Sequence, residues 1–505
     1  MSSEQIEEKS VDRTSAAASP VVDVALPSGL RRYTILFVLC LAQFIDSYNN
    51  TAIVTAIPPI SQDLSISNSE SVWLLSGYQI TLAAFLLSSG RLSDLYSPKW
   101  IFVVGTLLMS FCALGAGFVR SEIPLVVLRA FMGIGAAMNI PSAMSLIIKL
   151  FPEPAAQSQA LAAFVFISGV GNVLGLIMGA LFVSFANWTW VFYFATITAF
   201  IAVIAILLLL PSSANLEDAK TEEDYKRKLL RLDPIGVSSM TIALILFVFA
   251  VTSGSIRGWD TAQVIAPLVL SIVLIIFFGF WETRMPVGFA AIPLSMWRYP
   301  DFTILIIVSL YPFMWWASVQ MLLSWLYQEV YGWSTIIAAV HFLPLGLVSF
   351  VMVVVSSALQ RRFPLKLVIL LGQVLALAGS VILPFASSKE RYWSFTFPGF
   401  VLGSAGTVII FTTTNIALFT ITPPEVAGVV GAIYTCALQI GSTAGPAIVT
   451  SIQTSVQITH GGPGGFAGRA AGFWFLFAFG VAEMVGVLVF MHHKVPPKST
   501  GGQVA

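Results

Sequence analysis

GRLSDLYSPKW, residues 90–100, is a short polar segment between two long apolar runs, and it indicates the fold of the chain. Arg91, Asp94 and Lys99 lie within it, whereas the flanking runs, 71–92 and 100–119, hold no further charged residue. Each run has about 20 residues, the length that crosses the hydrocarbon core of a bilayer. The segment is therefore predicted to be a turn at one membrane face, between two spanning helices.

The composition points to lipid as the main solvent. Of the 505 residues, 57% are hydrophobic and 10% are charged, and the mean hydropathy is +0.89. A soluble domain carries about 25% charged residues. The net charge of +1 gives no support for nucleic-acid binding. Cys40, Cys112 and Cys436 all lie inside apolar runs, so they predict neither a disulfide framework nor a metal site.

Apolar runs of spanning length recur along the whole chain. In lipid such runs are helical, because each backbone group must find its partner inside the segment. The predicted fold is an all-α polytopic membrane protein with fourteen transmembrane helices, at roughly 33–57, 71–92, 100–119, 123–149, 158–183, 189–211, 235–253, 263–282, 302–326, 334–358, 364–387, 393–420, 426–454 and 470–491.

The distribution of Lys and Arg predicts the orientation. With the N-terminus inside, 19 of the 25 basic residues fall in cytoplasmic segments, five fall outside, and Arg129 lies within a span. This agrees with the excess of positive charge found in cytoplasmic loops. Both termini are thus expected in the cytoplasm. The head of the chain, without an apolar core of signal-peptide length, is expected to be a disordered tail before an uncleaved first span.

Two features predict how the chain is divided. The charged segment 212–234 follows the sixth run and is either an amphipathic surface helix or a solvated linker. A weak repeat relates run five, with Gly171, Gly175 and Gly179, to run thirteen, with Gly441, Gly445 and Pro446; each follows a Pro/Glu turn. Repeated halves are typical of transporters. The predicted parts are a cytoplasmic tail, a first six-helix half, a linker, two inserted helices, a second six-helix half and a cytoplasmic tail, at 1–32, 33–211, 212–234, 235–282, 283–491 and 492–505.

Several motifs, in order along the spans, resemble the major facilitator superfamily. They are the turn with Gly90, Leu92, Asp94 and Lys99, the fourth-span Arg129 with Gly133, Gly135 and Ala136, and the fifth-span glycines. Asp46 with residues 51–60, and residues 332–346, resemble the fourteen-span drug:proton antiporter branch, which includes fungal-type aminotriazole and drug resistance transporters. The resemblance implies the major facilitator fold, two six-helix halves plus two extra helices.

The departures from the family pattern affect two expectations. Leu95, Ser97 and Pro98 stand where the family has Arg and Gly-Arg, so the cytoplasmic latch implied for Gly90, Arg91, Asp94 and Lys99 is expected to be weak. Leu176 and Met178 stand where the antiporter motif has Pro and Gly, which leaves other coupling modes open beside proton antiport.

Charged side chains inside the spans are the candidates for coupling. A charge at mid-membrane costs about 2.5–3.5 kcal/mol on insertion scales, so it marks a functional site by default. Asp46 is predicted to carry a proton or cation, with Arg129 as its switchable partner; the alternative is a fixed structural ion pair. Glu483 is a second coupling or substrate-contact candidate, or faces internal water. His341 titrates near neutral pH or is simply hydrogen-bonded within the bundle.

Amide and aromatic side chains are the candidates for a substrate cavity. Amides recur at one or two per span, and they either line a polar-spotted cavity or join helices at about 0.6 kcal/mol each. The tryptophans either form a cavity wall or lie in an interfacial belt. The predicted cavity residues are Gln43, Asn49, Asn50, Gln79, Asn139, Asn172, Trp316, Gln320, Tyr434 and Gln439.

These observations predict a monomeric secondary transporter that exports a small organic compound against protons by alternating access, with no cofactor and no metal. The chain has no P-loop motif, so ATP is not expected as the driver. Transport of ammonium or borate, implied by the same branch, is the alternative. A non-transporting sensor and a membrane enzyme are disfavoured by Asp46 and by the scattered histidines. The plasma membrane or an internal membrane is the expected location.

Overall fold

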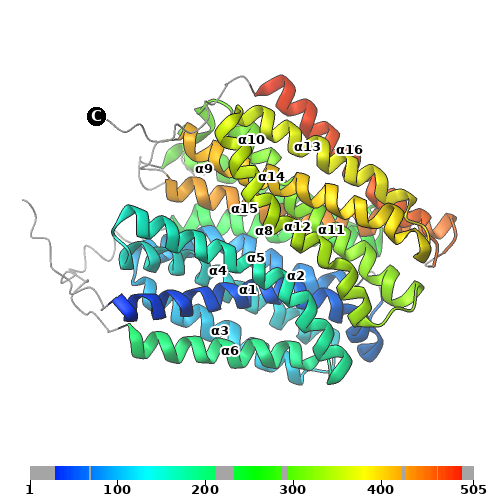
Figure 1. Ribbon diagram of the computed structural model, residues 1–505, viewed down its shortest axis with the longest axis horizontal. Coiled ribbons are helices and arrows are strands. Elements are labelled where there is room, and N and C mark those ends of the chain that lie inside the picture. Colours follow the sequence, from blue (N-terminus) through cyan, green and yellow to red (C-terminus); the bar gives the residue numbers. More distant parts are fainter. Residues whose placement is uncertain are drawn as a thin grey trace, which may run out of the picture.

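The structure is a computed structural model that describes residues 29–67, 70–210, 233–285, 294–422, 427–462 and 464–491. Within these ranges every regular element is helical, which confirms the predicted all-α class. The helices run roughly alongside one another (Figure 1). The end of the bundle where α1 begins and α16 ends is called the terminal face below, and the opposite end is called the distal face.

The first six helices form one packed group. Their bounds are α1 (Gly29–Leu64), α2 (Val72–Leu95), α3 (Pro98–Phe118), α4 (Glu122–Leu150), α5 (Pro154–Phe185) and α6 (Thr189–Leu209). Helix α5 packs on α1, α4 packs on both α2 and α3, and α6 packs on α3 and α1. Most of these contacts therefore join helices that are not consecutive along the chain.

The last helices repeat this arrangement. Their bounds are α10 (Phe302–Val308), α11 (Tyr311–Trp325), η3 (Leu326–Val330), α12 (Thr335–Arg362), α13 (Leu365–Ile382), η4 (Leu383–Phe385), η5 (Lys389–Arg391), η6 (Tyr392–Thr396), α14 (Phe397–Ile421), α15 (Ala427–Thr459) and α16 (Ala467–Phe490). Helix α15 packs on α11, α14 packs on α12 and α13, and α16 packs on α13 and, with fewer contacts, on α10 and α11. The pairings match those of the first group one by one.

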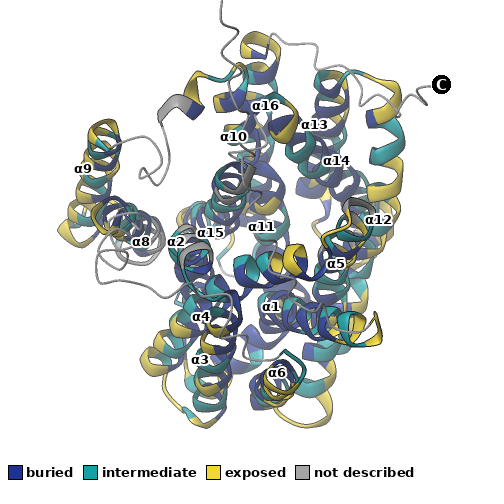
Figure 2. Cartoon of the chain, turned by 90° about the vertical axis from the view of Figure 1, so that its left-hand side faces the viewer, coloured by how far each residue is buried: buried dark blue, intermediate teal, exposed yellow. Residues whose placement is uncertain are grey.

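Two further helices lie beside the bundle. Helix α8 (Pro234–Arg257) packs against α2 and α15, and α9 (Ala262–Arg284) packs against α8. Viewed from the terminal face, this pair projects to one side of the two groups (Figure 2). A short helix, η2 (Leu294–Arg298), follows α9. The pair thus covers one of the two seams between the groups, and α5 meets α12 at the other.

The predicted number of spans is only partly tested. Twelve helices in the described residues are long and apolar enough to cross a membrane. Helix α1, with 36 residues, is not among the twelve, and the apolar stretch found in α2, Val72–Leu86, is shorter than required. Fourteen therefore stays a prediction, as do the predicted boundaries. Helix α1 begins inside the predicted tail 1–32, and most of the linker 212–234 lies outside the described residues.

The glycine stripes explain how closely the repeated pairs pack. A Cβ atom at Gly171 would lie 2.8 Å from the carbonyl oxygen of Phe44, and one at Gly179 would lie 2.5 Å from that of Ala52. In the second group, a Cβ atom at Gly441 would lie 2.0 Å from the carbonyl oxygen of Leu310. The stripes therefore bring α5 onto α1, and α15 onto the start of α11, within each group.

Candidate functional site

Asp46 lies in the middle of α1 and is only 3% exposed. Asn139 of α4 lies beside its carboxylate but forms no hydrogen bond of standard length and angle. The Asn139 amide oxygen accepts a hydrogen bond from Thr106 at 3.0 Å. Its amide nitrogen has no partner among the described residues. Both oxygens of Asp46 are likewise unpaired within the described part of the chain. The site is a buried carboxyl group next to one amide donor.

Arg129 of α4 is 1% exposed, and its contacts are with other groups than Asp46. Its Nε donates to the carbonyl oxygen of Leu74 at 2.9 Å, and Nη1 donates to that of Asn49 at 3.3 Å. The guanidinium carbon lies 4.7 Å from the centre of the Tyr78 ring. These contacts join α1, α2 and α4.

The described side chains form no ion pair between Arg129 and Asp46 within 4.0 Å. The arginine charge is compensated by two carbonyl dipoles and an aromatic face, whereas the carboxyl group has no such compensation. An ionised carboxylate buried without a partner is costly, and a bound proton removes the charge. Asp46 and Arg129 therefore have separate environments in this conformation.

A small pocket of about 10 Å³ lies between α5, α11 and α12, where the two groups meet. Asn172, Trp316 and Gln320, three of the predicted cavity residues, line it together with Val173, Leu176, Phe342, Leu343, Leu345 and Gly346. Its volume is enough for about one water molecule. Most of the lining is apolar, and Asn172 and Gln320 are its two amides.

Two other predicted cavity residues, Asn49 and Tyr434, use their polar groups to join helices, whereas Asn50 bonds within its own helix. Asn49 donates to the sulfur of Met109 at 3.6 Å, and Asn50 donates to the backbone oxygen of Asp46 at 3.2 Å. Tyr434 donates to the carbonyl oxygen of Phe411 at 2.7 Å. Gln79 and Gln439 are buried, and the amide oxygens of Gln43, Asn50 and Gln79 have no hydrogen bond among the described residues.

The second intramembrane carboxylate, Glu483 of α16, lies in the second group and not beside Asp46. It is 4% exposed, and in the described part of the chain neither of its oxygens is hydrogen-bonded. Tyr311 of α11 lies near enough for an electrostatic interaction with Glu483. The Tyr311 hydroxyl lies 3.1 Å from the hydroxyl of Ser380, and the Ser380 hydroxyl also accepts a hydrogen bond from Trp315 at 2.9 Å. Glu483 is therefore a separate site between α11, α13 and α16.

His341 lies near the start of α12, at the distal face, on a different helix from either carboxylate. Its Nδ1 is 2.7 Å from the carbonyl oxygen of Ile337, and its ring centre is 4.1 Å from that of Trp333 and 4.3 Å from that of Tyr392. The histidine is thus part of an aromatic cluster that packs α12 against the segments before α12 and α14.

The fold, with its two similar halves, agrees with the family whose model the sequence matches. A family model described as the Major Facilitator Superfamily matches residues 39–292 and 282–446. The chain belongs to the major facilitator superfamily. It is a secondary transporter, and it is an integral membrane protein with many spans.

Relatives within the superfamily cover most of the chain. The multidrug transporter mfsC of Aspergillus fumigatus is 26% identical over 81% of this chain and 77% of its own length. The puromycin resistance protein pur8 of Streptomyces alboniger is 27% identical over 85% and 83%. A low affinity ammonium transporter of Saccharomyces cerevisiae is 24% identical over 83% and 81%.

Solved structures of other transporters share the fold. A bacterial homologue of the lysosomal transporter Spinster has a TM-score of 0.58 and is 17% identical, with coverage of 92% of this chain and 96% of its own. A POT peptide transporter in complex with sulfate has a TM-score of 0.64 at 14% identity, with coverage of 92% and 96%.

The structure describes only part of the predicted latch at Gly90, Arg91, Asp94 and Lys99. The side chains of Arg91 and Asp94 lie outside the described part of the structure. Lys99 donates through Nζ to the carbonyl oxygen of Leu210, at the end of α6 in its own half. Lys366, at the start of α13, donates in the same way to Met491 at the end of α16. Each lysine neutralises the negative end of a helix dipole, and a latch across the halves stays a prediction.

Tyr78 and Ser324 are two site residues that the sequence did not reveal. Tyr78 is fully buried and supplies the ring under Arg129. Ser324 of α11 donates to the carbonyl oxygen of Val54 at 2.9 Å, and so joins the second half to α1. A tyrosine or serine within an apolar run is common, so neither carries a signal in one sequence. For Tyr78, only its place next to the amide Gln79 sets it apart.

Proposed function

We propose that this transporter exports small, largely apolar organic compounds in exchange for protons, and that Asp46 binds the proton. The observation that carries the proposal is the Asp46 carboxyl group, which is buried and unpaired among the described residues. The motif resemblance in the first span and the resistance and efflux names of the relatives in Aspergillus and Streptomyces support the direction and the class of substrate.

The separate placement of Arg129 supports a proton cycle. In the present conformation its positive charge is held by backbone carbonyl groups and by Tyr78. When Asp46 loses its proton, a negative charge appears in the same region of low dielectric constant and attracts the guanidinium group. We propose that this attraction draws α4 and α1 into a different arrangement, which couples protonation to alternating access.

The contacts between the halves support assignment of this conformation to the inward-facing state. Near the distal face, Ser324 donates to Val54, and Gln328 donates to the carbonyl oxygen of Thr55 at 3.4 Å. Gln62 donates to Glu329 at 3.5 Å. These bonds close the distal side of the α1–α11 contact. With the positive-inside bias, the terminal face is cytoplasmic in the proposal, and both termini lie there.

The pocket between α5, α11 and α12 supports an organic substrate. Trp316, Phe342 and Leu176 offer apolar contact, and Asn172 and Gln320 offer hydrogen bonds. A volume of about 10 Å³ is too small for a drug-sized molecule, so we propose that the pocket enlarges as the halves move. Ammonium transport is the second candidate, because one relative carries that name and because Asp46 is an isolated carboxyl group that a small cation also fits.

The test is flux in proteoliposomes with an imposed pH gradient. Radiolabelled puromycin and the fluorescent cation ethidium serve as organic probes, and radiolabelled methylammonium serves as the probe for the alternative. We expect the organic probes to move against an inward proton flux, and the rate to rise as the proton-donating side becomes more acidic. Methylammonium flux without puromycin or ethidium flux would favour the alternative.

Asp46→Asn is the decisive variant, because it keeps the size of the side chain and removes the proton site. We expect pH-driven flux to fall to that of empty vesicles, while probe exchange without a pH gradient continues. Asp260→Asn, the same change in the exposed turn after α8, is the matched control and should leave the flux unaltered. Full pH-driven flux in Asp46→Asn would contradict the proposal.

A further inference from the structure

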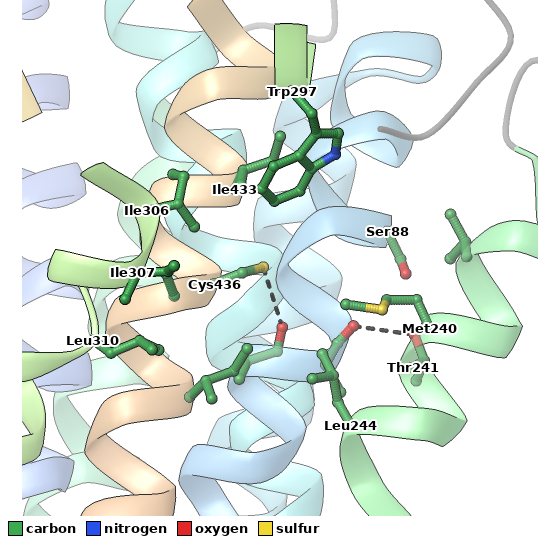
Figure 3. A pocket seen from close by; sticks show the side chains of 15 residues that line it. Ser88, Met240, Thr241, Leu244, Trp297, Ile306, Ile307, Leu310, Ile433 and Cys436 are labelled. Carbon is green, nitrogen blue, oxygen red and sulfur yellow. Dashed lines mark hydrogen bonds between the residues drawn. The ribbon is translucent and has the colours of Figure 1, made fainter. Parts of the chain in front are cut away.

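A larger cavity of about 190 Å³ lies away from Asp46, at the covered seam between the halves (Figure 3). Its walls come from α2 of the first half, from α10 and α15 of the second half, from the inserted helix α8, and from η2, the short helix after α9. None of its lining residues belongs to the pocket between α5, α11 and α12. This space is called the seam pocket below.

The seam pocket offers little to a polar ligand. Thr241 of α8 donates its hydroxyl to the carbonyl oxygen of Ala84 at 3.1 Å. Cys436 of α15 donates its thiol to the carbonyl oxygen of Ala83 at 3.6 Å. Both bonds join one wall to another, as the dashed lines in Figure 3 show. Apart from these two, Ser88 and the indole N–H of Trp297, the lining side-chain groups are apolar, so hydrocarbon is the chemistry that fits.

Its size admits part of a lipid chain, and its place gives such a chain access. An apolar cavity of about 150 Å³ already holds benzene, and this one is larger. The lining residues Val237 to Leu244 lie in the part of α8 nearest the terminal face. At its rim, Trp297 is 39% exposed and Ile307 is 43% exposed, so in a bilayer they contact hydrocarbon. The medium next to the pocket is thus the lipid leaflet at the terminal face.

We infer that the seam pocket binds one acyl chain of a bilayer lipid from that leaflet. The small residues Ala83, Ala84 and Ala437 leave the space, and α8 closes it on the side away from the bundle. Because α2 and α15 belong to different halves, any rocking of the halves changes the shape of the pocket. A bound chain therefore favours the present spacing of α2 and α15 and links lipid composition to the conformational equilibrium.

Photo-crosslinking in nanodiscs tests the inference. The probe is a phospholipid with a diazirine in its acyl chain, and labelled residues are found by mass spectrometry. Leu244, Ile433 and Ala437 are only 6%, 5% and 4% exposed, so a chain reaches them only by entering the pocket. Ile276 of α9 is 67% exposed and serves as the reference for ordinary lipid contact. We expect labelling of both sets; labelling of Ile276 alone overturns the inference.

Variants that fill the pocket sharpen the test. Ala437→Phe fills it from α15, and Met240→Trp fills it from α8 in case the first variant does not fold. Either should abolish labelling of Leu244 and Ile433 and leave that of Ile276 unchanged. Persistent labelling of the buried residues in both folded variants contradicts a chain in this space.

Two further arms identify the source of the chain. Excess fatty acid without a headgroup should not displace the lipid label, and neither should puromycin or ethidium. Displacement by the fatty acid would assign the pocket to a free acid, and displacement by a probe would assign it to the substrate path; either overturns the lipid assignment. Labelling requires no transport, so Asp46→Asn should label normally, and failure of the proton proposal is distinguishable from failure of this one.

Discussion

At the scale of single residues, Asp46 and Arg129 were identifiable because charge inside an apolar run is costly and therefore rare. Their relation was not identifiable. The prediction made Arg129 the switchable partner of Asp46; in this conformation Arg129 contacts Leu74, Asn49 and Tyr78 and forms no ion pair with Asp46, and the switch itself stays a prediction. Backbone carbonyl groups are present at every residue, so a sequence cannot show which of them an arginine will contact.

Tyr78 gives a prediction with an internal control. Its hydroxyl has no partner among the described residues, and its ring faces Arg129. Tyr78→Phe keeps the ring and should fold and transport normally. Tyr78→Leu removes the ring face, and we expect it to cost about 0.5–2 kcal/mol in the free energy of unfolding and to reduce transport. Thermal unfolding of the purified variants followed by size-exclusion chromatography measures the difference; equal loss in both variants would show that the hydroxyl, not the ring, matters.

Arg129→Lys tests whether the forked shape of the guanidinium group is needed. Nε and Nη1 reach carbonyl groups on two different helices, and one ammonium group is not shaped to reproduce both contacts and the stacked ring. We expect folded protein with a lower thermal midpoint and slower pH-driven flux. Wild-type flux in this variant would mean that only the positive charge is required.

At the scale of helices, the glycine stripes show what a pattern can and cannot predict. Spacing at every fourth residue indicated close helix packing, and the match between runs five and thirteen indicated a repeat. The partner of each stripe was not readable, because it depends on which helix the chain folds against. In the structure the partners are α1 and the start of α11.

Gly179→Ala should therefore force α5 away from α1. The new methyl group would lie 2.5 Å from the carbonyl oxygen of Ala52, which is backbone and cannot rotate away. We expect a loss of about 1–3 kcal/mol in the free energy of unfolding. Gly279→Ala in α9 is the control, because no atom lies within 4 Å of its Cβ position, and it should be neutral or gain up to about 1 kcal/mol. Thermal midpoints of the two variants give the comparison, and a stable Gly179→Ala would refute tight packing of α5 on α1.

At the scale of the whole molecule, hydropathy and charge bias gave the class of protein, since every span must be apolar to lie in lipid. Hydropathy and charge bias could not predict the seam pocket. Its walls combine residues 83–88, 237–244, 306–310 and 433–440 with Trp297, and only the packed bundle brings these together. The contact of α1 with α11 near the distal face likewise depends on how the halves are rotated, which no local pattern encodes.

That contact allows a direct test of alternating access. Ser324 Oγ lies 2.9 Å from the carbonyl oxygen of Val54, so cysteines at these positions are close enough for a short bifunctional thiol reagent. Crosslinking Val54→Cys to Ser324→Cys, with Cys40, Cys112 and Cys436 replaced by alanine, should hold the distal face closed and stop flux; a cleavable reagent should restore it. The matched pair is Ser47→Cys with Ser168→Cys, whose hydroxyl groups are 2.7 Å apart within the first half. If the halves move as rigid units, this second crosslink should leave most of the flux intact. Equal inhibition by both pairs would place the essential motion within the first half.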